Sequence, residues 1–262
     1  MSDHTFAICA YKESPYLQDC INSLKNQSVQ SNIILITSTP CDYISDIADK
    51  NNIPLYVNSG EKGITQDWNY AYKTANTEWV TIAHQDDVYQ KDYAKFLSLY
   101  KNAVSHPLIF FTDYAELRNG SIVEKSLLLT VKRILLLPLR AKILWNCKVA
   151  KWFALAFGTA ICCPSVTFYK PNLPDEVFAH NFRADEDWEA WERIYHLKGA
   201  FIFCNKKLVL HRIHVDSETT KILADNKRTE EDYVMFKKFW ISPIAFLITK
   251  LYSLSQRSNS LG

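Results

Sequence analysis

Residues 78–87 of the chain read Glu78-Trp79-Val80-Thr81-Ile82-Ala83-His84-Gln85-Asp86-Asp87. The apolar part, residues 78–83, predicts a buried strand, because short apolar runs are typical of strands covered on both faces. Ligands of open α/β sheets bind at the carboxyl ends of the strands, which is where Asp86 and Asp87 would lie. Adjacent carboxylates repel each other unless a cation offsets their charge, and Mg²⁺ or Mn²⁺ suits such oxygen ligands. We therefore predict a divalent metal site that binds a diphosphate; the alternative is an acidic loop before a helix that starts near Gln90.

The first half of the chain alternates short apolar runs with amphipathic segments, which is the pattern of βαβ units and a parallel sheet. Strands are predicted at residues 5–10, 32–37, 53–57, 78–83 and 108–112. Helices are predicted between them at residues 16–26, 43–50, 65–75 and 92–104. Together these elements predict an α/β fold with a Rossmann-like, mostly parallel central sheet flanked by helices.

The alternation stops near residue 118, and a helical insertion is predicted at about residues 120–157. Within it, residues 127–140 mix leucines with basic residues, in apolar runs shorter than the roughly 20 residues that a spanning helix needs. Residues 221–262 predict a helical C-terminal extension, in which residues 236–252 combine aromatic residues with lysines. Both segments could pack on the core, or they could lie on a membrane surface as interfacial helices do.

The composition is that of an ordinary globular chain of 262 residues, of which 48% are hydrophobic and 22% are charged. A formal net charge of +2 is too small to indicate nucleic acid as the main partner. Seven cysteines without paired Cys-x-x-Cys spacing indicate neither a disulfide framework nor a zinc site. The start, Met1-Ser2-Asp3-His4, lacks the features of a signal peptide. We expect a cytoplasmic protein that could be peripheral on the inner face of the plasma membrane.

A second acidic cluster, Asp185-Glu186-Asp187, opens a segment in which aromatic residues recur at helical spacing. A carboxylate at a helix start is held rigidly, as a general base must be. The alternative is that the three acids only stabilise the helix dipole. The histidines at positions 180, 196 and 211 are assigned to packing or to the surface, and a bracing role is predicted for Trp68 and Trp188.

Five motifs, in this order, resemble those of family 2 glycosyltransferases with the GT-A fold, and the resemblance extends from about Thr5 to Ser217. They are Ala10-Tyr11-Lys12-Glu13, Gly63-Ile64-Thr65-Gln66-Asp67-Trp68-Asn69, the pair Asp86-Asp87, Asp185-Glu186-Asp187-Trp188 and Arg212-Ile213-His214-Val215-Asp216-Ser217. The resemblance implies a GT-A fold with a helical C-terminal extension. Two departures stand out. Thr37-Ser38-Thr39-Pro40 replaces an Asp-Asp-Gly-Ser turn, and His84 stands where many members have the first acid of an Asp-x-Asp motif.

The resemblance also implies roles for individual residues. Asp187 is expected to be the general base. Mg²⁺ or Mn²⁺ would be held by Asp86 and Asp87 alone, or with His214 as a further ligand. Donor-binding residues are expected at positions that match the family's motifs, namely Ala10, Tyr11, Glu13, Thr37, Asp67, Asn69 and Asp86.

The function implied is metal-assisted transfer of a sugar, with inversion, from a nucleotide-diphosphate sugar to a glycan or lipid-linked glycan acceptor during surface polysaccharide biosynthesis. One alternative is a catalytically silent, membrane-bound scaffold subunit with the same fold. The other is a sugar nucleotidyltransferase, which is disfavoured because residues 10–14 contain no glycine for a phosphate-binding loop. A glycosyltransferase domain is predicted at residues 1–220, with a nucleotide-sugar half at 1–115 and an acceptor half at 116–220, followed by the extension at 221–262.

Overall fold

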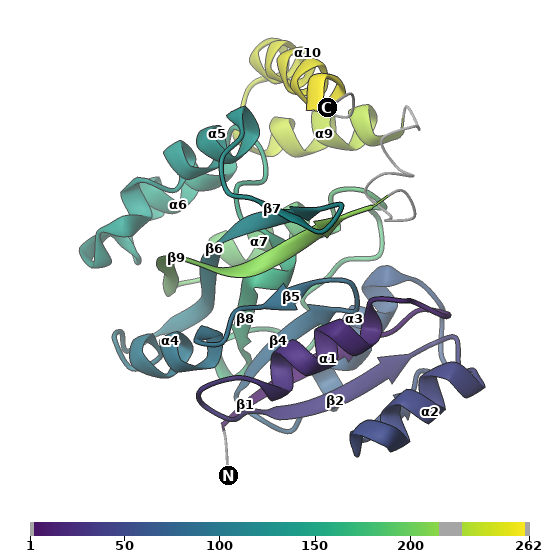
Figure 1. Ribbon diagram of the computed structural model, residues 1–262. Coiled ribbons are helices and arrows are strands. Elements are labelled where there is room, and N and C mark those ends of the chain that lie inside the picture. Colours follow the sequence, from purple (N-terminus) through teal and green to yellow (C-terminus); the bar gives the residue numbers. More distant parts are fainter. Residues whose placement is uncertain (1–2, 215–226, 260–262) are drawn as a thin grey trace.

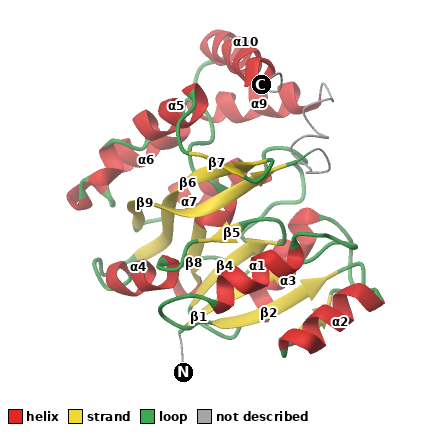
Figure 2. Ribbon diagram, viewed as in Figure 1, coloured by secondary structure: helices red, strands yellow, loops and turns green. Residues whose placement is uncertain are grey.

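The computed structural model describes residues 3–214 and 227–259, and its central feature is one nine-stranded sheet with helices on its faces (Figures 1 and 2). The strands are β1 His4–Cys9, β2 Asn32–Thr37, β3 Leu55–Val57, β4 Trp79–His84, β5 Val88–Tyr89, β6 Pro107–Arg118, β7 Ser121–Val123, β8 Val166–Tyr169 and β9 Ala200–Ile213. The helices are α1 Leu17–Lys25, α2 Asp42–Asn51, α3 Ile64–Thr74, α4 Tyr93–Tyr100, α5 Leu127–Leu135, α6 Lys148–Leu155, α7 Glu186–Tyr195, α9 Lys227–Phe239 and α10 Ser242–Asn259. Short 3₁₀ turns are η1 Pro138–Arg140, η2 Lys142–Leu144, η3 Cys163–Ser165 and η4 Lys170–Asn172.

The strand order is β3-β2-β1-β4-β8-β6-β9-β5, with β7 paired to β6. The first four strands pair in parallel, as do β6 and β9, and these parallel pairs hold most of the paired residues. The antiparallel pairs all involve β8, β5 or β7. The predicted α/β fold, with a mostly parallel sheet flanked by helices, is therefore confirmed.

The elements predicted in the first half are all present, with small shifts at their ends. The third strand is shorter than predicted, because the N–H of Ile53 donates to the carbonyl of Ala48 in α2 and Pro54 has no N–H. The helix predicted at 92–104 ends at Tyr100. The strand predicted at 108–112 continues to Arg118, since its extra residues pair with β9 and β7.

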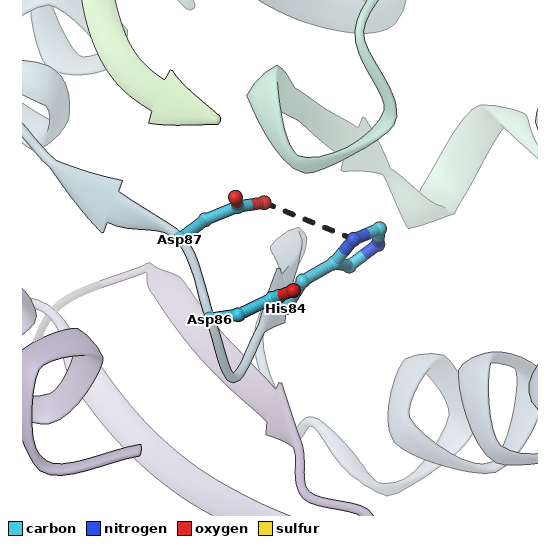
Figure 3. A group of neighbouring side chains, drawn as sticks. All are labelled: His84, Asp86 and Asp87. Carbon is cyan, nitrogen blue, oxygen red and sulfur yellow. Dashed lines mark ion pairs between the residues drawn. The ribbon is translucent and has the colours of Figure 1, made fainter. Parts of the chain in front are cut away.

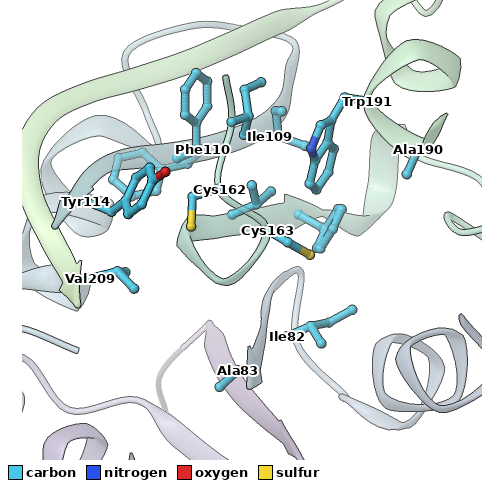
Figure 4. Close-up of a cluster of buried hydrophobic side chains, with 14 of the residues drawn as sticks. Ile82, Ala83, Ile109, Phe110, Tyr114, Cys162, Cys163, Ala190, Trp191 and Val209 are labelled. Atoms are coloured by element: carbon cyan, nitrogen blue, oxygen red, sulfur yellow. The ribbon is translucent and has the colours of Figure 1, made fainter. Parts of the chain in front are cut away.

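The core lies where β4, β6, β8 and α7 meet, directly behind the carboxyl end of β4 (Figure 4). Ile82 and Ala83 are buried immediately before His84, and Trp191 of α7 stacks on Phe168 of β8 with ring centroids 5.7 Å apart. Burial of these side chains fixes the strand end and the helix that carry the two predicted acidic motifs.

The predicted helical insertion contains α5, η1, η2 and α6, and the predicted C-terminal extension contains α9 and α10. The division of the domain at residues 115 and 116 stays a prediction. The predicted boundary at residues 220 and 221 lies outside the described residues, as do Val215, Asp216 and Ser217 of the last motif.

Candidate active site at the carboxyl end of β4

The acidic pair lies on the turn between β4 and β5, together with His84 (Figure 3). His84 is the last residue of β4, and the N–H of Asp87 donates to the carbonyl of His84 at 3.2 Å, which closes the turn. As a result, one ligand atom from each of His84, Asp86 and Asp87 lies within 4.8 Å of the other two. The strand end therefore gathers one imidazole and two carboxylates.

Asp87 is fully buried, and β9 holds its carboxylate in place. Its Oδ1 atom accepts hydrogen bonds from His211 Nδ1 at 3.0 Å and from the N–H of Arg212 at 2.8 Å. Burial would raise the pKa of Asp87, but His211 and His84 outweigh it and hold the pKa below its usual value. For His211, burial is likewise outweighed by Asp87, which raises the pKa of this histidine. His211 is therefore a satisfied histidine, as predicted, and its partner is Asp87, because the pairing of β9 beside β5 brings it onto that acid.

Asp86 is contacted by Arg212 and His214, which lie at the end of β9 and just after it. Its Oδ2 atom lies 3.0 Å from His214 Nε2, and its main-chain carbonyl accepts from Arg212 Nε at 2.7 Å. The guanidinium of Arg212 also lies over the ring of Tyr16, 4.3 Å from its centroid. The downstream motif thus contacts both acids of the pair.

The arrangement suits a divalent cation. Among the described residues, Asp87 Oδ2 and His84 Nε2 are buried without a hydrogen-bond partner, a costly state that a metal ligand bond would relieve. The ring of His84 is stacked on Trp68 at 5.1 Å, which fixes its orientation. His84, which was not among the predicted ligands, joins the two acids as a candidate, and His214 stays one through its contact with Asp86.

Asp187 lies in the first turn of α7, whose N-terminal end carries Asp185, Glu186 and Asp187. Its Oδ1 atom accepts from the N–H of Trp188 at 2.7 Å, which orients the carboxylate. Burial raises the pKa of Asp187, and the positive charge of Lys132 is the strongest opposing influence, with a smaller one from His84. A raised pKa suits a group that must accept a proton.

The C-terminal helix α9 fixes the start of α7. The carboxylate of Glu231 accepts from the N–H groups of Arg183 at 3.1 Å, Ala184 at 2.8 Å and Asp185 at 3.3 Å. Asp232 lies beside Asp185, and burial is the main cause that raises both carboxyl pKa values, that of Asp232 to about 6. The acid that binds the segment leading into this helix is therefore on another element, 46 residues away from Asp185.

Trp188 is fully buried and braces the same junction, as predicted. Its Nε1 atom donates to the carbonyl of Leu155 at 3.0 Å, and its ring packs edge-on against Phe236 of α9 at 4.9 Å. The indole thus links α6, α7 and α9.

The predicted donor residues of the first motif lie beside the turn between β4 and β5. Ala10 is buried just after β1, whereas Tyr11 is 49% exposed. The main chain of Tyr11 is paired with the side chain of Gln85, since its N–H donates to Oε1 at 3.0 Å and its carbonyl accepts from Nε2 at 3.2 Å. Glu13 lines an open cavity of about 740 Å³ with Thr39 and Lys62.

The remaining predicted donor residues have partners within the protein. Asp67 accepts from Ser38 Oγ at 2.6 Å and from Asn58 Nδ2 at 2.8 Å. Thr37 is buried at the end of β2, and its hydroxyl accepts from the N–H of Thr39 at 3.0 Å. Asp67 therefore shapes the turn after β2, next to the cavity, and the donor-binding roles stay predictions.

Asn69 is turned toward a different loop. Its Oδ1 atom accepts from the N–H groups of Val177 at 3.1 Å and Phe178 at 3.0 Å, and its Nδ2 atom donates to the carbonyl of Phe178 at 2.8 Å. Asn69 thereby ties α3 to the segment that precedes α7. Its predicted contact with the donor stays a prediction.

The family model for glycosyl transferase family 2 matches residues 5–173, which include the β4 turn. The chain belongs to glycosyl transferase family 2. It is therefore a glycosyltransferase, and the resemblance carried by the sequence motifs is confirmed. No curated protein sequence matches the chain.

Solved structures show the same fold as this family member. A fragment of S. aureus TarS in complex with UDP-GlcNAc is 16% identical, with a TM-score of 0.63 over 94% of this chain and 70% of the fragment. The chain covers 42% of a longer TarS structure. The Pyrobaculum calidifontis mannosyltransferase PcManGT, in complex with GDP-Man and Mn²⁺, is 14% identical, with a TM-score of 0.60 over 96% of this chain and 69% of that one. Glucosyl-3-phosphoglycerate synthase from Mycobacterium tuberculosis is 10% identical, with a TM-score of 0.52 over 84% of this chain and 77% of that one. The GT-A fold is thereby confirmed.

Proposed function

We propose that the protein transfers a sugar from a nucleotide-diphosphate sugar to a hydroxyl of a glycan or lipid-linked glycan acceptor, with inversion at the anomeric carbon. The observation that carries this proposal is the cluster of His84, Asp86 and Asp87 at the carboxyl end of β4, in a chain that belongs to glycosyl transferase family 2. Such a displacement needs a group that stabilises the leaving diphosphate and a base that accepts the proton of the hydroxyl. We assign the first role to the β4 turn and the second to Asp187.

The donor would lie over the carboxyl ends of β1, β2 and β4. Asp86, Asp87 and either His84 or His214 would hold a divalent cation there, and when bound it would neutralise the charge of the diphosphate. An imidazole among the ligands favours Mn²⁺ over Mg²⁺, because Mg²⁺ strongly prefers oxygen. The structural neighbours with UDP-GlcNAc, and with GDP-Man and Mn²⁺, support a nucleotide-sugar donor.

Asp187 would act as the general base. The acceptor oxygen forms a bond to the anomeric carbon while the bond from that carbon to the diphosphate oxygen breaks, and the hydroxyl proton passes to the carboxylate of Asp187. A single displacement of this kind inverts the configuration and needs no covalent intermediate. Trp188 and α9 hold the carboxylate in place, and Lys132 favours its ionised form.

The acceptor is proposed to be a growing surface polysaccharide, carried by a lipid at the inner face of a membrane. The support is the basic and apolar character of residues 127–140 and 236–252, which the next subsection develops.

Turnover of nucleotide sugars by the wild type and by Asp187→Asn tests the proposal, with the anomeric configuration of the product read by proton NMR. We expect the variant to bind the nucleotide normally and to lose about 10²- to 10⁴-fold in kcat, the usual contribution of a general base. Retention of configuration, or an unimpaired variant, would contradict the assigned role of Asp187.

A further inference from the structure

Two stretches of the chain contain basic residues and no acids. No aspartate or glutamate occurs between Glu124 and Asp175, where eight lysines and arginines occur. None follows Asp232 either, where Lys237, Lys238, Lys250 and Arg257 occur. The first stretch includes α5 and α6, and the second includes α10. Lys132, Arg133 and Lys151 are bonded within the protein, to Tyr114, Asp113 and the carbonyl of Gly199. Arg140, Lys142, Lys148 and Lys250 are exposed, and they give these helices a local positive charge that the net charge of the whole chain conceals.

The outer side of α5 is apolar and exposed. Leu127, Val131 and Ile134 recur at the spacing of one helical stripe, and Leu127 is 76% exposed. Beyond α5, Ile143 of η2, which is 88% exposed, and Val149 of α6 are further exposed apolar residues. Single exposed apolar residues are ordinary, but a row of large ones beside lysines and arginines marks an interaction surface.

The helix α10 also exposes apolar residues on its outer side. Ala245 and Thr249 are buried against the protein, whereas Ile244, Leu247 and Leu251 form an exposed stripe on another side. On that outer side, Lys250 Nζ lies 4.5 Å from the ring centroid of Phe246, itself exposed. A helix of a water-facing protein surface would present polar residues there instead.

The helices α5, α6 and α10 lie at the same end of the molecule (Figure 1). Trp240, which precedes α10, donates from Nε1 to the carbonyl of Ala156 at 2.7 Å and packs on Trp152 of α6 at 5.1 Å. Tyr252 of α10 lies against Gly158, just after α6. We call the exposed apolar residues of α5, η2, α6 and α10, with their neighbouring lysines and arginines, the docking face.

We propose that the docking face binds the surface of an anionic lipid bilayer. Apolar side chains at the boundary between headgroups and acyl chains, flanked by lysines and arginines, are the arrangement by which amphipathic helices lie on such bilayers. In the part of the chain that the structure describes, no helix is long and apolar enough to cross a membrane. The face would therefore hold the protein on one leaflet.

Docking would also bring the acceptor to the active site, and this step rests on the function proposed above. On the inner side of α5, Lys132 Nζ donates to Tyr114 OH at 3.0 Å and acts on the pKa of Asp187. We infer that a lipid-linked acceptor approaches the active site from the bilayer on which the docking face lies.

Co-sedimentation with vesicles tests the docking face. Vesicles of phosphatidylglycerol and phosphatidylcholine should bind the wild-type chain, and vesicles of phosphatidylcholine alone should bind it weakly. Leu247→Glu and Ile134→Glu should each weaken binding about 10- to 100-fold, since each replaces an apolar side chain that would be buried in the bilayer with a charged one. Leu99→Glu, at a 64% exposed position of α4, is the matched control and should bind as the wild type does.

Equal binding of all three variants, or no binding to anionic vesicles, would overturn the proposal. So would a dimer in solution that Leu247→Glu and Ile134→Glu dissociate, because the occupant would then be a second copy of the chain. Calorimetric binding of nucleotides to the same proteins separates the two proposals. Vesicle binding without nucleotide binding would refute the proposed function alone, and nucleotide binding without vesicle binding would refute the docking face alone.

Discussion

Replacing Glu231 by alanine should both destabilise the protein and impair catalysis. The change removes one carboxylate that accepts from three consecutive backbone N–H groups at residues 183–185, with donor to acceptor distances of 2.8–3.3 Å. Hydrogen bonds to charged groups are worth about 1.5–3 kcal/mol. Because Glu231 is partly exposed, we expect a loss of about 1–2 kcal/mol, or about 2–8 °C in Tm for a chain of this size.

The catalytic effect follows from the position of the three N–H groups that Glu231 binds. The three N–H groups lie just before Asp187, so their release would loosen the base while leaving the β4 turn intact. A displacement of about 1 Å at a reacting group can cost about 10²-fold in rate. We expect kcat to fall about 10- to 100-fold, with little change in the KM for the donor.

Thermal unfolding and steady-state kinetics of Glu231→Ala measure the two effects. Glu230→Ala is the matched control, because Glu230 is the preceding residue of α9 and is exposed. If the two variants share the same Tm and the same kcat, α9 does not position the base and the reasoning is refuted.

Three further predictions concern buried polar groups. Lys132→Met should move the acidic limb of the kcat profile to higher pH, because Lys132 opposes the rise in the pKa of Asp187; Lys125→Met, measured alongside, should leave the limb in place. Asp232→Asn should flatten the dependence of stability on pH. The carboxyl pKa of Asp232, raised to about 6, adds stability that is complete below about pH 4 and is lost as the pH rises through 6. The Tm of the wild type should therefore fall over that range more than the Tm of the variant. Asn69→Ala should cost about 2–3 kcal/mol in urea unfolding, from three buried hydrogen bonds at about 1 kcal/mol each, whereas Asn76→Ala at an exposed position should cost almost nothing; equal midpoints would show that Asn69 does not tie α3 to residues 177–178.

Local sequence patterns predicted the parallel half of the fold well, because each βαβ unit there is built from consecutive apolar and amphipathic segments. The second half was predicted only as a helical insertion and two motifs. There, β9 pairs with both β6 and β5, which are far from it in sequence, and a pattern within one segment does not specify its neighbours. The long extension of β6 to Arg118 was missed for the same reason.

The candidate site shows the same division. Asp86, Asp87 and Asp187 could be predicted as candidates, because acids after a strand or at a helix start have a local pattern. The contact of His211 with Asp87 was missed because the two residues are 124 positions apart in the chain. Glu231 was missed as well, since a carboxylate supplied by a distant helix leaves no local signal at the segment that it binds. Adjacency to Arg212, itself within a motif, was the one signal that could have indicated His211.

Calorimetric binding of UDP, GDP, dTDP and CMP, with and without Mn²⁺, to the wild type and to Asp86→Ala tests the central claim most directly. We predict that one nucleoside diphosphate binds the wild type only when Mn²⁺ is present, and that the variant does not bind it. Binding that is independent of Mn²⁺ and unchanged in Asp86→Ala, or no binding of any nucleotide, would contradict a metal and diphosphate site at the carboxyl end of β4.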